Sequence, residues 1–155
     1  MEIDVTLAEG EQQIAGAALQ EVLTDLVDLS LVGKQAHWTL VGPRFRSVHL
    51  QLGEAVTTAR QFADDVAERA AAIGVAPDGR AGRVAADLVI AEHPTGWVAD
   101  DDVVAWFVEQ LGAVIERARR QIEETEKADP VTQDLIIALV ASLEKHRWMF
   151  QAERS

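Results

Sequence analysis

Residues 45–73 read FRSVHLQLGEAVTTARQFADDVAERAAAI and contain no proline. Their apolar residues recur every three or four positions, at Val48, Leu52, Ala55, Ala59, Phe62, Val66 and Ala70. This spacing is typical of an amphipathic helix, in which every third or fourth residue falls on the same face. Gly74 follows at once, and glycine commonly ends helices. The stretch therefore predicts a helix over 45–73 with one face in a hydrophobic core.

Three more long helices are predicted on either side of this stretch, because the chain's 4 prolines leave long segments uninterrupted. The first runs from about Thr6 to Trp38, with helical spacing at Leu19, Val22, Leu23, Leu26, Ser30, Gly33 and His37. The third begins near Asp100–Asp102, since acidic residues favour helix starts. The fourth runs from Asp129–Pro130, a typical N-cap and first-turn pair, to about Ala152.

Residues 75–98 are rich in glycine, alanine and proline and connect the second long helix to the third. A short helix over Arg80–Ile90 fits within this crossover, and no segment alternates apolar and polar residues as a strand would. The expected fold class is all-α, a ferritin-like four-helix bundle with a long crossover that carries a short helix. We expect a single domain over 1–155 with a short acidic N-terminal tail at about 1–6.

Charge and composition limit the function. The chain has 14 Lys and Arg against 26 Asp and Glu, a formal charge of −12, which disfavours a nucleic-acid footprint and favours cations. Cysteine is absent, so disulfides, thiolate metal sites and cysteine nucleophiles are excluded. The start of the chain lacks the basic residues of a signal peptide, and the apolar run at 135–143 is too short to span a bilayer. These features predict a cytoplasmic protein with no membrane partner.

Polar residues beside the core stripe of the second helix form the candidate site. Asp64 and Glu68 lie one helical turn apart, so their carboxylates can converge on one cation. His49 lies on the same side of the helix, but fifteen residues of helix separate it from Asp64, a rise of about 22 Å. His37 can approach His49 if the second helix folds back on the first. The sequence thus predicts a histidine pair and a separate carboxylate pair.

An antiparallel two-fold dimer of second helices would superpose the histidine pair of one subunit on the carboxylate pair of the other. Mixed imidazole and carboxylate ligands suit Fe(II), Mn(II) or Zn(II). The residues alone leave a plainer alternative open. Asp64 and Glu68 also fit a solvated run of charges, and a histidine on an apolar stripe is more often a core residue than a ligand.

The motifs resemble those of a known family. Residues 37–42, HWTLVG, followed by Phe45 and Val48–His49, closely resemble the signature of the Dps family, the twelve-subunit mini-ferritins of bacteria. DDVAER at 64–69 resembles the family's second motif. The similarity extends over nearly the whole chain and includes EKHRWM at 144–149.

The resemblance implies a hollow homo-dodecamer with a ferroxidase centre shared across each two-fold interface. It assigns His37 and His49 of one subunit, with Asp64 and Glu68 of the facing subunit, as the iron ligands and catalytic residues. Fe(II) would be oxidised there, preferably by hydrogen peroxide, and stored inside as Fe(III) mineral. Removing Fe(II) and peroxide together would protect against oxidative damage.

The resemblance also implies roles outside that centre. Glu54 matches a position that faces the cavity and helps nucleate mineral in some relatives, and it equally fits an exposed acid. Asp129 and Asp134 match the region that lines the three-fold pores, although Asp129 is also the expected N-cap. His146 is expected to pack between helices, and His93 to lie in a surface loop.

Two observations keep alternatives open. Gly53 stands four residues after His49, where the family usually has Asp or Glu, and the missing negative charge should weaken Fe(II) binding. A cage with a degenerate centre, or one that holds Zn(II) or Mn(II), is therefore an alternative. A DNA-binding nucleoid protein is another, but residues 1–13 carry four acids and no base, so direct DNA binding is disfavoured.

Overall fold

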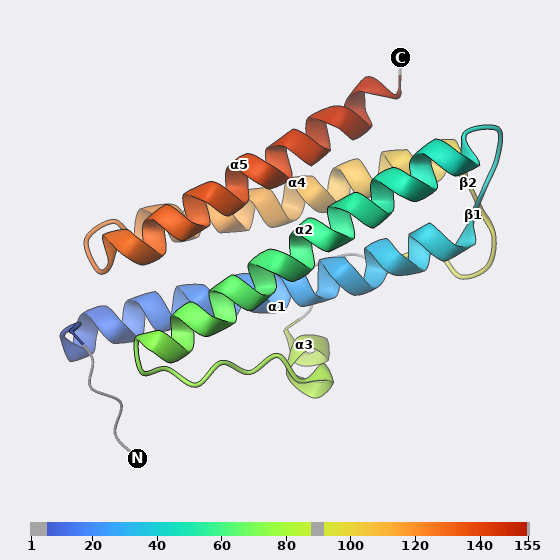
Figure 1. Cartoon of the computed structure of the whole chain (residues 1–155). Coiled ribbons are helices and arrows are strands. Elements are labelled where there is room, and N and C mark those ends of the chain that lie inside the picture. Colours follow the sequence, from blue (N-terminus) through green and yellow to red (C-terminus); the bar gives the residue numbers. More distant parts are fainter. Residues whose placement is uncertain (1–5, 88–91, 155) are drawn as a thin grey trace.

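The computed structural model of the chain describes residues 6–87 and 92–154. Its long helices lie side by side as a bundle (Figure 1) and are α1 (Glu9–Thr39), α2 (Phe45–Ala72), α4 (Asp100–Thr125) and α5 (Pro130–Ala152). α1 packs against α2, α4 packs against α5, and α1 also contacts α4. The predicted all-α bundle of four long helices is confirmed, and the helix limits differ from the predicted ones by a few residues at most.

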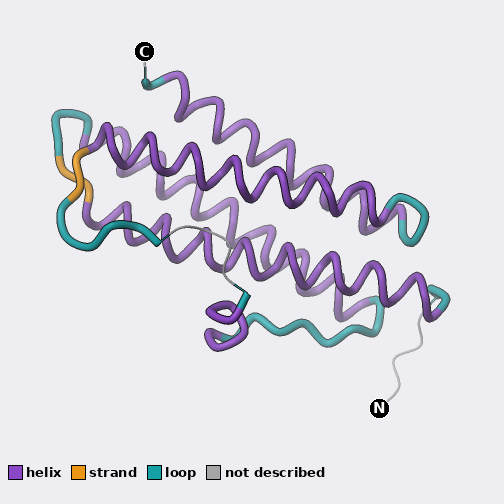
Figure 2. The backbone as a smooth tube through the Cα atoms, turned by 180° about the vertical axis from the view of Figure 1, so that it is seen from behind, coloured by secondary structure: helices purple, strands orange, loops and turns teal. Residues whose placement is uncertain are grey.

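The first part of the crossover from α2 to α4, residues 73–87, runs along the outside of the bundle and carries the short helix α3 (Ala81–Ala86), as Figure 2 shows from behind. The predicted helix extended to residue 90, but residues 88–90 lie outside the described residues, as do residues 1–5 of the predicted acidic tail. Gln20 on α1 fastens the crossover, because its side-chain amide donates to the Asp78 carbonyl and accepts from the Asp78 N–H, both at 2.9 Å. Val84 is the buried residue of α3.

A short parallel pairing joins the end of α1 to the start of α4. It links β1 (Leu40–Val41) to β2 (Val98–Ala99), drawn in orange in Figure 2. The sequence predicted no strand, since two residues are too few to leave an alternating pattern. The pairing holds the α1–α2 turn against the first turn of α4.

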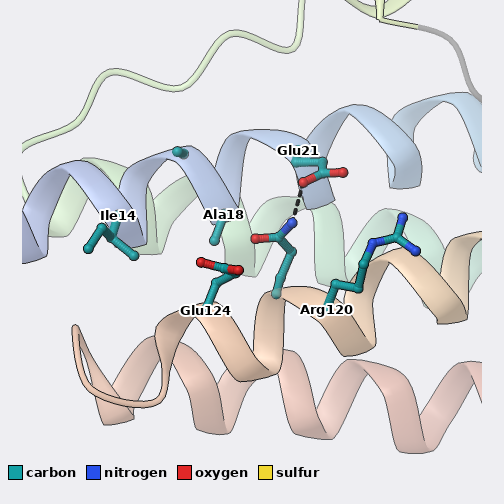
Figure 3. Close-up of a pocket in the computed structure, with 7 residues that line it drawn as sticks. Ile14, Ala18, Glu21, Arg120 and Glu124 are labelled. Atoms are coloured by element: carbon teal, nitrogen blue, oxygen red, sulfur yellow. Dashed lines mark hydrogen bonds between the residues drawn. The ribbon is translucent and has the colours of Figure 1, made fainter.

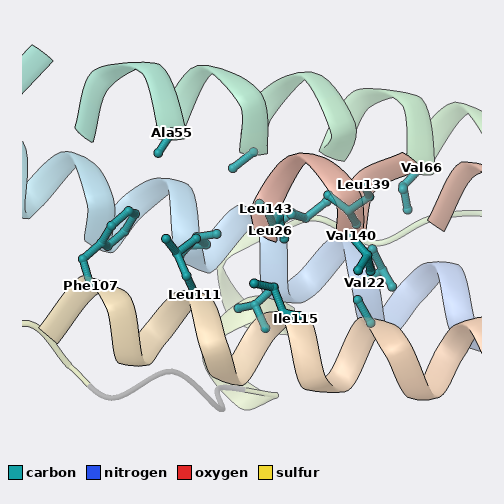
Figure 4. Packing of buried hydrophobic residues seen from close by; sticks show 14 of the residues in the cluster. Val22, Leu26, Ala55, Val66, Phe107, Leu111, Ile115, Leu139, Val140 and Leu143 are labelled. Carbon is teal, nitrogen blue, oxygen red and sulfur yellow. The ribbon is translucent and has the colours of Figure 1, made fainter. Parts of the chain in front are cut away.

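The core lies between the four long helices and is built largely from the predicted stripes (Figure 4). In α2 every predicted core residue is buried except Phe62, which packs against the core while partly exposed. The largest fully buried side chains include Leu19, Leu26, Leu52, Phe107, Leu111, Ile136, Leu139, Leu143 and Phe150. Burying one such side chain contributes about 1.5–3 kcal/mol, so these residues fix how the helices pack.

Asp129 caps α5 as predicted. Its carboxylate accepts from the backbone N–H groups of Val131 and Thr132, both at 3.2 Å, and receives the Arg69 guanidinium of α2 at 2.7 Å. Burial alone would raise the pKa of Asp129, but hydrogen bonds from Arg69 and Thr132 hold that pKa below its usual value. The residue thus fixes the start of α5 and ties it to α2.

Asp129→Ala is expected to lower the free energy of unfolding by about 3 kcal/mol, because helix N–H groups and a partly buried guanidinium lose their acceptor. Asp134→Ala is the matched control, since Asp134 is exposed in the first turns of the same helix and should cost less than about 0.5 kcal/mol. Urea unfolding measures both. Equal losses in the two variants would contradict the assignment of Asp129.

A buried carboxylate on α1 faces α4. Asp25 is only 3% exposed, and its Oδ2 accepts from Arg117 Nε at 2.8 Å. Arg117 also binds Glu21 at 2.6 Å, so one guanidinium serves two acids. Burial raises the pKa of Asp25 to about 6, an effect that Arg117 opposes and that Glu21 and Asp28 reinforce.

Because this folded-state pKa lies above the ordinary value of 3.8, the folded chain binds the proton more tightly than the unfolded chain between about pH 4 and about pH 6. The contribution of Asp25 to stability is therefore greatest in acid and is lost as pH rises through that window.

Asp25→Asn should remove this dependence. The free energy of unfolding of the wild type, minus that of Asp25→Asn, is expected to rise by about 1 kcal/mol on going from about pH 7.5 to about pH 5. Urea titrations at the two pH values measure it, with the exposed Asp102→Asn as control. A difference that stays constant with pH would show that Asp25 does not titrate in this range.

Candidate metal centre

His37 and His49 meet where α1 turns into α2. His37 lies in the last turn of α1 and His49 near the start of α2, joined by the short connection at 40–44. Their rings stack with centroids 3.5 Å apart and an interplanar angle of 22°. Phe45 also stacks on His49, with centroids 5.1 Å apart. The predicted approach of the two histidines is confirmed, while their role as ligands stays a prediction.

Each histidine donates a hydrogen bond to the backbone of the other. His37 Nδ1 lies 2.7 Å from the His49 carbonyl oxygen, and His49 Nδ1 lies 2.8 Å from the His37 carbonyl oxygen. A carbonyl only accepts, so both Nδ1 atoms carry the proton. In the neutral rings Nε2 then holds a lone pair, which is the form that binds a metal ion.

Electrostatics favour the neutral ring at His37. Burial lowers its pKa because the imidazolium form loses hydration, and nearby His49 and Lys34 lower it further, against the hydrogen bond to the His49 carbonyl. Near neutral pH a metal ion that binds His37 therefore competes with fewer protons for the ring.

Gly53 lies directly beside the His37 ring. A Cβ placed there would stand 3.5 Å from His37 Cε1 and 3.6 Å from Nδ1, which is ordinary van der Waals contact. A larger side chain at this position is therefore sterically acceptable. An acidic side chain here would extend from a point beside His37 Cε1, the ring atom bonded to Nε2.

Asp64 and Glu68 lie farther along α2 and are exposed. They are one turn apart on the helix, as predicted, and α2 is continuous from Phe45 to Ala72. Across residues 6–87 and 92–154, no three or more His, Asp or Glu side chains gather closely enough to hold a metal ion. A single chain thus forms the histidine pair but does not bring the carboxylate pair to it.

The remaining candidates are placed differently. Glu54 and Asp134 are exposed, whereas the Asp129 carboxylate is buried in its cap and ion pair. His146 packs between helices as predicted, with Nε2 2.8 Å from Thr58 Oγ1. The prediction for His93 is confirmed for the loop and wrong for the surface: this residue lies in the connection before β2 but is only 8% exposed.

His93 is buried because its ring packs edge-on against Trp106, with centroids 4.7 Å apart. A tertiary contact of this kind leaves no local pattern, and the adjacent Pro94 pointed only to a loop. Sequence reasoning also missed a role for Asp100 beyond the start of a helix. Its carboxylate lies under the α1–α2 turn.

A groove opens elsewhere, between the first half of α1 and the last half of α4 (Figure 3). Ile14, Ala18 and Glu21 face Arg120 and Glu124 across it, and Gln121 donates to Glu21. Glu21 and His37 are separated by sixteen residues of helix, about 24 Å. This groove is therefore not part of the histidine pair.

Among the described residues, no helix is both long and apolar enough to cross a membrane.

Comparison with known proteins identifies the family. The model of the ferritin-like domain matches residues 16–154. The fine tangled pili major subunit of Haemophilus ducreyi is 36% identical over 148 residues, which cover 96% of this chain and 77% of that protein. DNA protection during starvation protein 2 of Deinococcus radiodurans is 36% identical over 135 residues, 87% of this chain and 56% of that relative. This chain thus spans little more than half of the second protein.

A solved structure agrees over almost the whole chain. Mycobacterium smegmatis Dps, in a tetragonal crystal form, is 33% identical, with a TM-score of 0.92 over 99% of this chain and 92% of that one. With the helical bundle, the paired histidines and these similarities, the chain belongs to the Dps family of ferritin-like proteins.

Proposed function

We propose that this protein is a mini-ferritin that oxidises Fe(II), preferably with hydrogen peroxide, and stores the ferric product in a homo-dodecameric cage. Membership of the Dps family supports a general role in iron storage and protection. The observation that carries the proposal is the reciprocal bonding of His37 and His49, which leaves both Nε2 atoms free for metal. Iron is the metal that the family implies, and the relatives lend no support to zinc or manganese.

The complete centre requires two subunits. His49 and Asp64 are fixed about 22 Å apart by the helix between them, so the histidines and carboxylates of one chain cannot share an ion. An antiparallel pair of α2 helices places His37 and His49 of one subunit against Asp64 and Glu68 of the next. The exposure of both carboxylates leaves them free for such a contact.

The proposed reaction uses iron as substrate. Two Fe(II) ions each give one electron to a hydrogen peroxide molecule, whose O–O bond breaks. With two water molecules, the products are two ferric oxyhydroxide units and four protons. Delivering both electrons to one peroxide avoids the hydroxyl radical that a single electron would release. The protein supplies nitrogen and oxygen ligands and holds the reactants away from free solution.

The surface charge fits cation uptake better than DNA binding. The formal charge of −12 on each subunit attracts Fe(II) and repels phosphate. Exposed Asp134 suits a pore and exposed Glu54 suits a nucleation site, whereas the ion pair of Asp129 neutralises much of its pull on cations. We propose a single-domain, cytoplasmic cage that binds no DNA directly.

The test is an anaerobic Fe(II) titration of metal-free protein, followed by peroxide and read by near-ultraviolet absorbance. The double variant His37→Ala/His49→Ala should oxidise Fe(II) no faster than buffer, because the nitrogen ligands are gone. Asp64→Ala/Glu68→Ala should fail in the same way, while His93→Ala, far along the chain from both pairs, serves as the histidine control. Wild-type oxidation no faster than buffer would rule out a working centre.

A mixing experiment tests whether the centre is shared. The histidine-free and carboxylate-free variants are unfolded together, refolded and assayed. Random pairing makes half of the dimers mixed, and each mixed dimer has one intact centre of two, so about a quarter of the wild-type rate should return. If all four ligands acted within one chain, mixing would restore nothing.

Gly53→Asp should strengthen the centre, because it adds a carboxylate beside His37 where a Cβ meets only ordinary contacts. We expect the Fe(II) concentration for half-maximal oxidation to fall by about tenfold. Gly53→Ala adds the same Cβ without charge and should leave it unchanged. A similar gain in both variants would attribute the effect to helix stability, since alanine is favoured over glycine by about 1 kcal/mol.

A further inference from the structure

The turn that joins the two histidine-bearing helices rests on one buried carboxylate. Asp100, the first residue of α4, is 5% exposed. Its Oδ2 accepts from the Arg44 backbone N–H at 2.7 Å, and its Oδ1 accepts from the Asp101 N–H at 2.9 Å. Gly42 crosses directly above it with φ +140°, so close that a Cβ there would stand 2.5–2.6 Å from the carboxylate.

Arg44 links the turn held by Asp100 to the residues that follow α5. Its guanidinium pairs with Asp101 and donates to the Glu153 carbonyl at 2.7 Å, after the end of α5. Its Nε also lies 3.9 Å from Asp100. Arg44 is the N-cap residue of α2, so these contacts fix where α2 begins relative to α4 and α5.

The histidine pair depends on where α2 begins. Each ring must reach the backbone carbonyl of the opposite helix, at 2.7 and 2.8 Å, and both bonds form only if α1 and α2 keep one relative position. Hydrogen bonds weaken steeply with distance and angle, so a shift of the turn by about 1 Å would break this reciprocity. Either Nε2 could then become the protonated nitrogen, which does not bind metal.

We propose that Asp100 is a positioning residue for the iron centre: by holding the Gly42–Arg44 turn, it keeps both histidines in the Nδ1–H form with Nε2 open to iron. Asp100 touches neither histidine and acts through the turn. The inference rests on the proposed ferroxidase function for its second test, the rate of iron oxidation. Its first test does not depend on that function, because the protonated nitrogen of each ring can be observed without metal.

The first readout is solid-state nitrogen NMR of metal-free protein labelled with ¹⁵N-histidine. The chain has only 4 histidines, so His37 and His49 are assigned by substituting each in turn. The wild type should show protonated Nδ1 and unprotonated Nε2 at both residues. Asp100→Asn keeps the size but loses one acceptor and the charge, and it should convert a substantial fraction of His37 or His49 to the Nε2–H form.

The second readout is the peroxide-driven oxidation of Fe(II). Asp100→Asn should raise the Fe(II) concentration for half-maximal rate by about tenfold and leave the maximal rate within about twofold, as for other outer groups that orient metal-binding histidines. Asp102→Asn is the matched control, since it removes the same charge from the same helical turn at an exposed position. Asp102→Asn should match the wild type in both readouts.

The outcomes separate the two proposals. A wild type that does not oxidise iron ends the ferroxidase proposal, while the NMR comparison still decides the role of Asp100. Asp100→Asn that unfolds at a lower temperature but keeps the wild-type histidine spectrum would make Asp100 merely structural and overturn the inference. If Asp100→Asn does not fold by circular dichroism, Asp100→Glu replaces it. That variant keeps the charge but pushes the carboxylate toward Gly42, and the same spectral change is expected.

Discussion

The stiffness of α2 is the constraint on which the candidate centre depends. This one helix carries His49 near its start and Asp64 and Glu68 near its end, and it is continuous between them. A continuous helix cannot fold these residues onto one ion, because the rise per residue is fixed at about 1.5 Å. The same stiffness makes the distance between the two half-sites reproducible, so a two-fold pairing that aligns one end also aligns the other. Packing within one chain therefore builds one half of each proposed centre near the start of α2 and the other half near its end.

The bundle was predictable because its elements are long and its interruptions few. Stretches of 23 to 31 residues with helical spacing identify the long helices from local pattern alone, and the Asp129–Pro130 pair marks the start of α5 in the residues themselves. The pairing of β1 with β2 and the burial of His93 were not predictable, since both follow from contacts between distant segments. A sequence pattern reports local preference, and neither a two-residue strand nor one histidine is long enough to show a periodic pattern.

The candidate centre was also predictable only in part. Helix geometry was enough to group Asp64 with Glu68, and a chain reversal at Pro43 was enough to bring His37 toward His49. The protonated nitrogen of each ring could not be predicted, because it is set by a carbonyl on the opposite helix. Asp100 was visible in the sequence only as a helix-start acid, although its carboxylate also accepts from the Arg44 N–H of the turn. The residue types indicated the chemistry, and tertiary contacts determined the protonation.

Splitting the ligands between subunits has a thermodynamic consequence for the proposed cage. In the proposed centre, a separate subunit would bind iron weakly through two histidine nitrogens, whereas paired subunits would bind it through nitrogens and carboxylates together. An ion that binds the assembled form more tightly must stabilise assembly by the same factor, because the coupling between two equilibria is reciprocal. In the proposed pairing, Asp64 and Glu68 without iron bring two negative charges together against neutral histidine rings, which works against pairing. Iron at the proposed centre would neutralise those charges, so the acidity that draws Fe(II) to the protein would also make the bound ion part of what holds two subunits together.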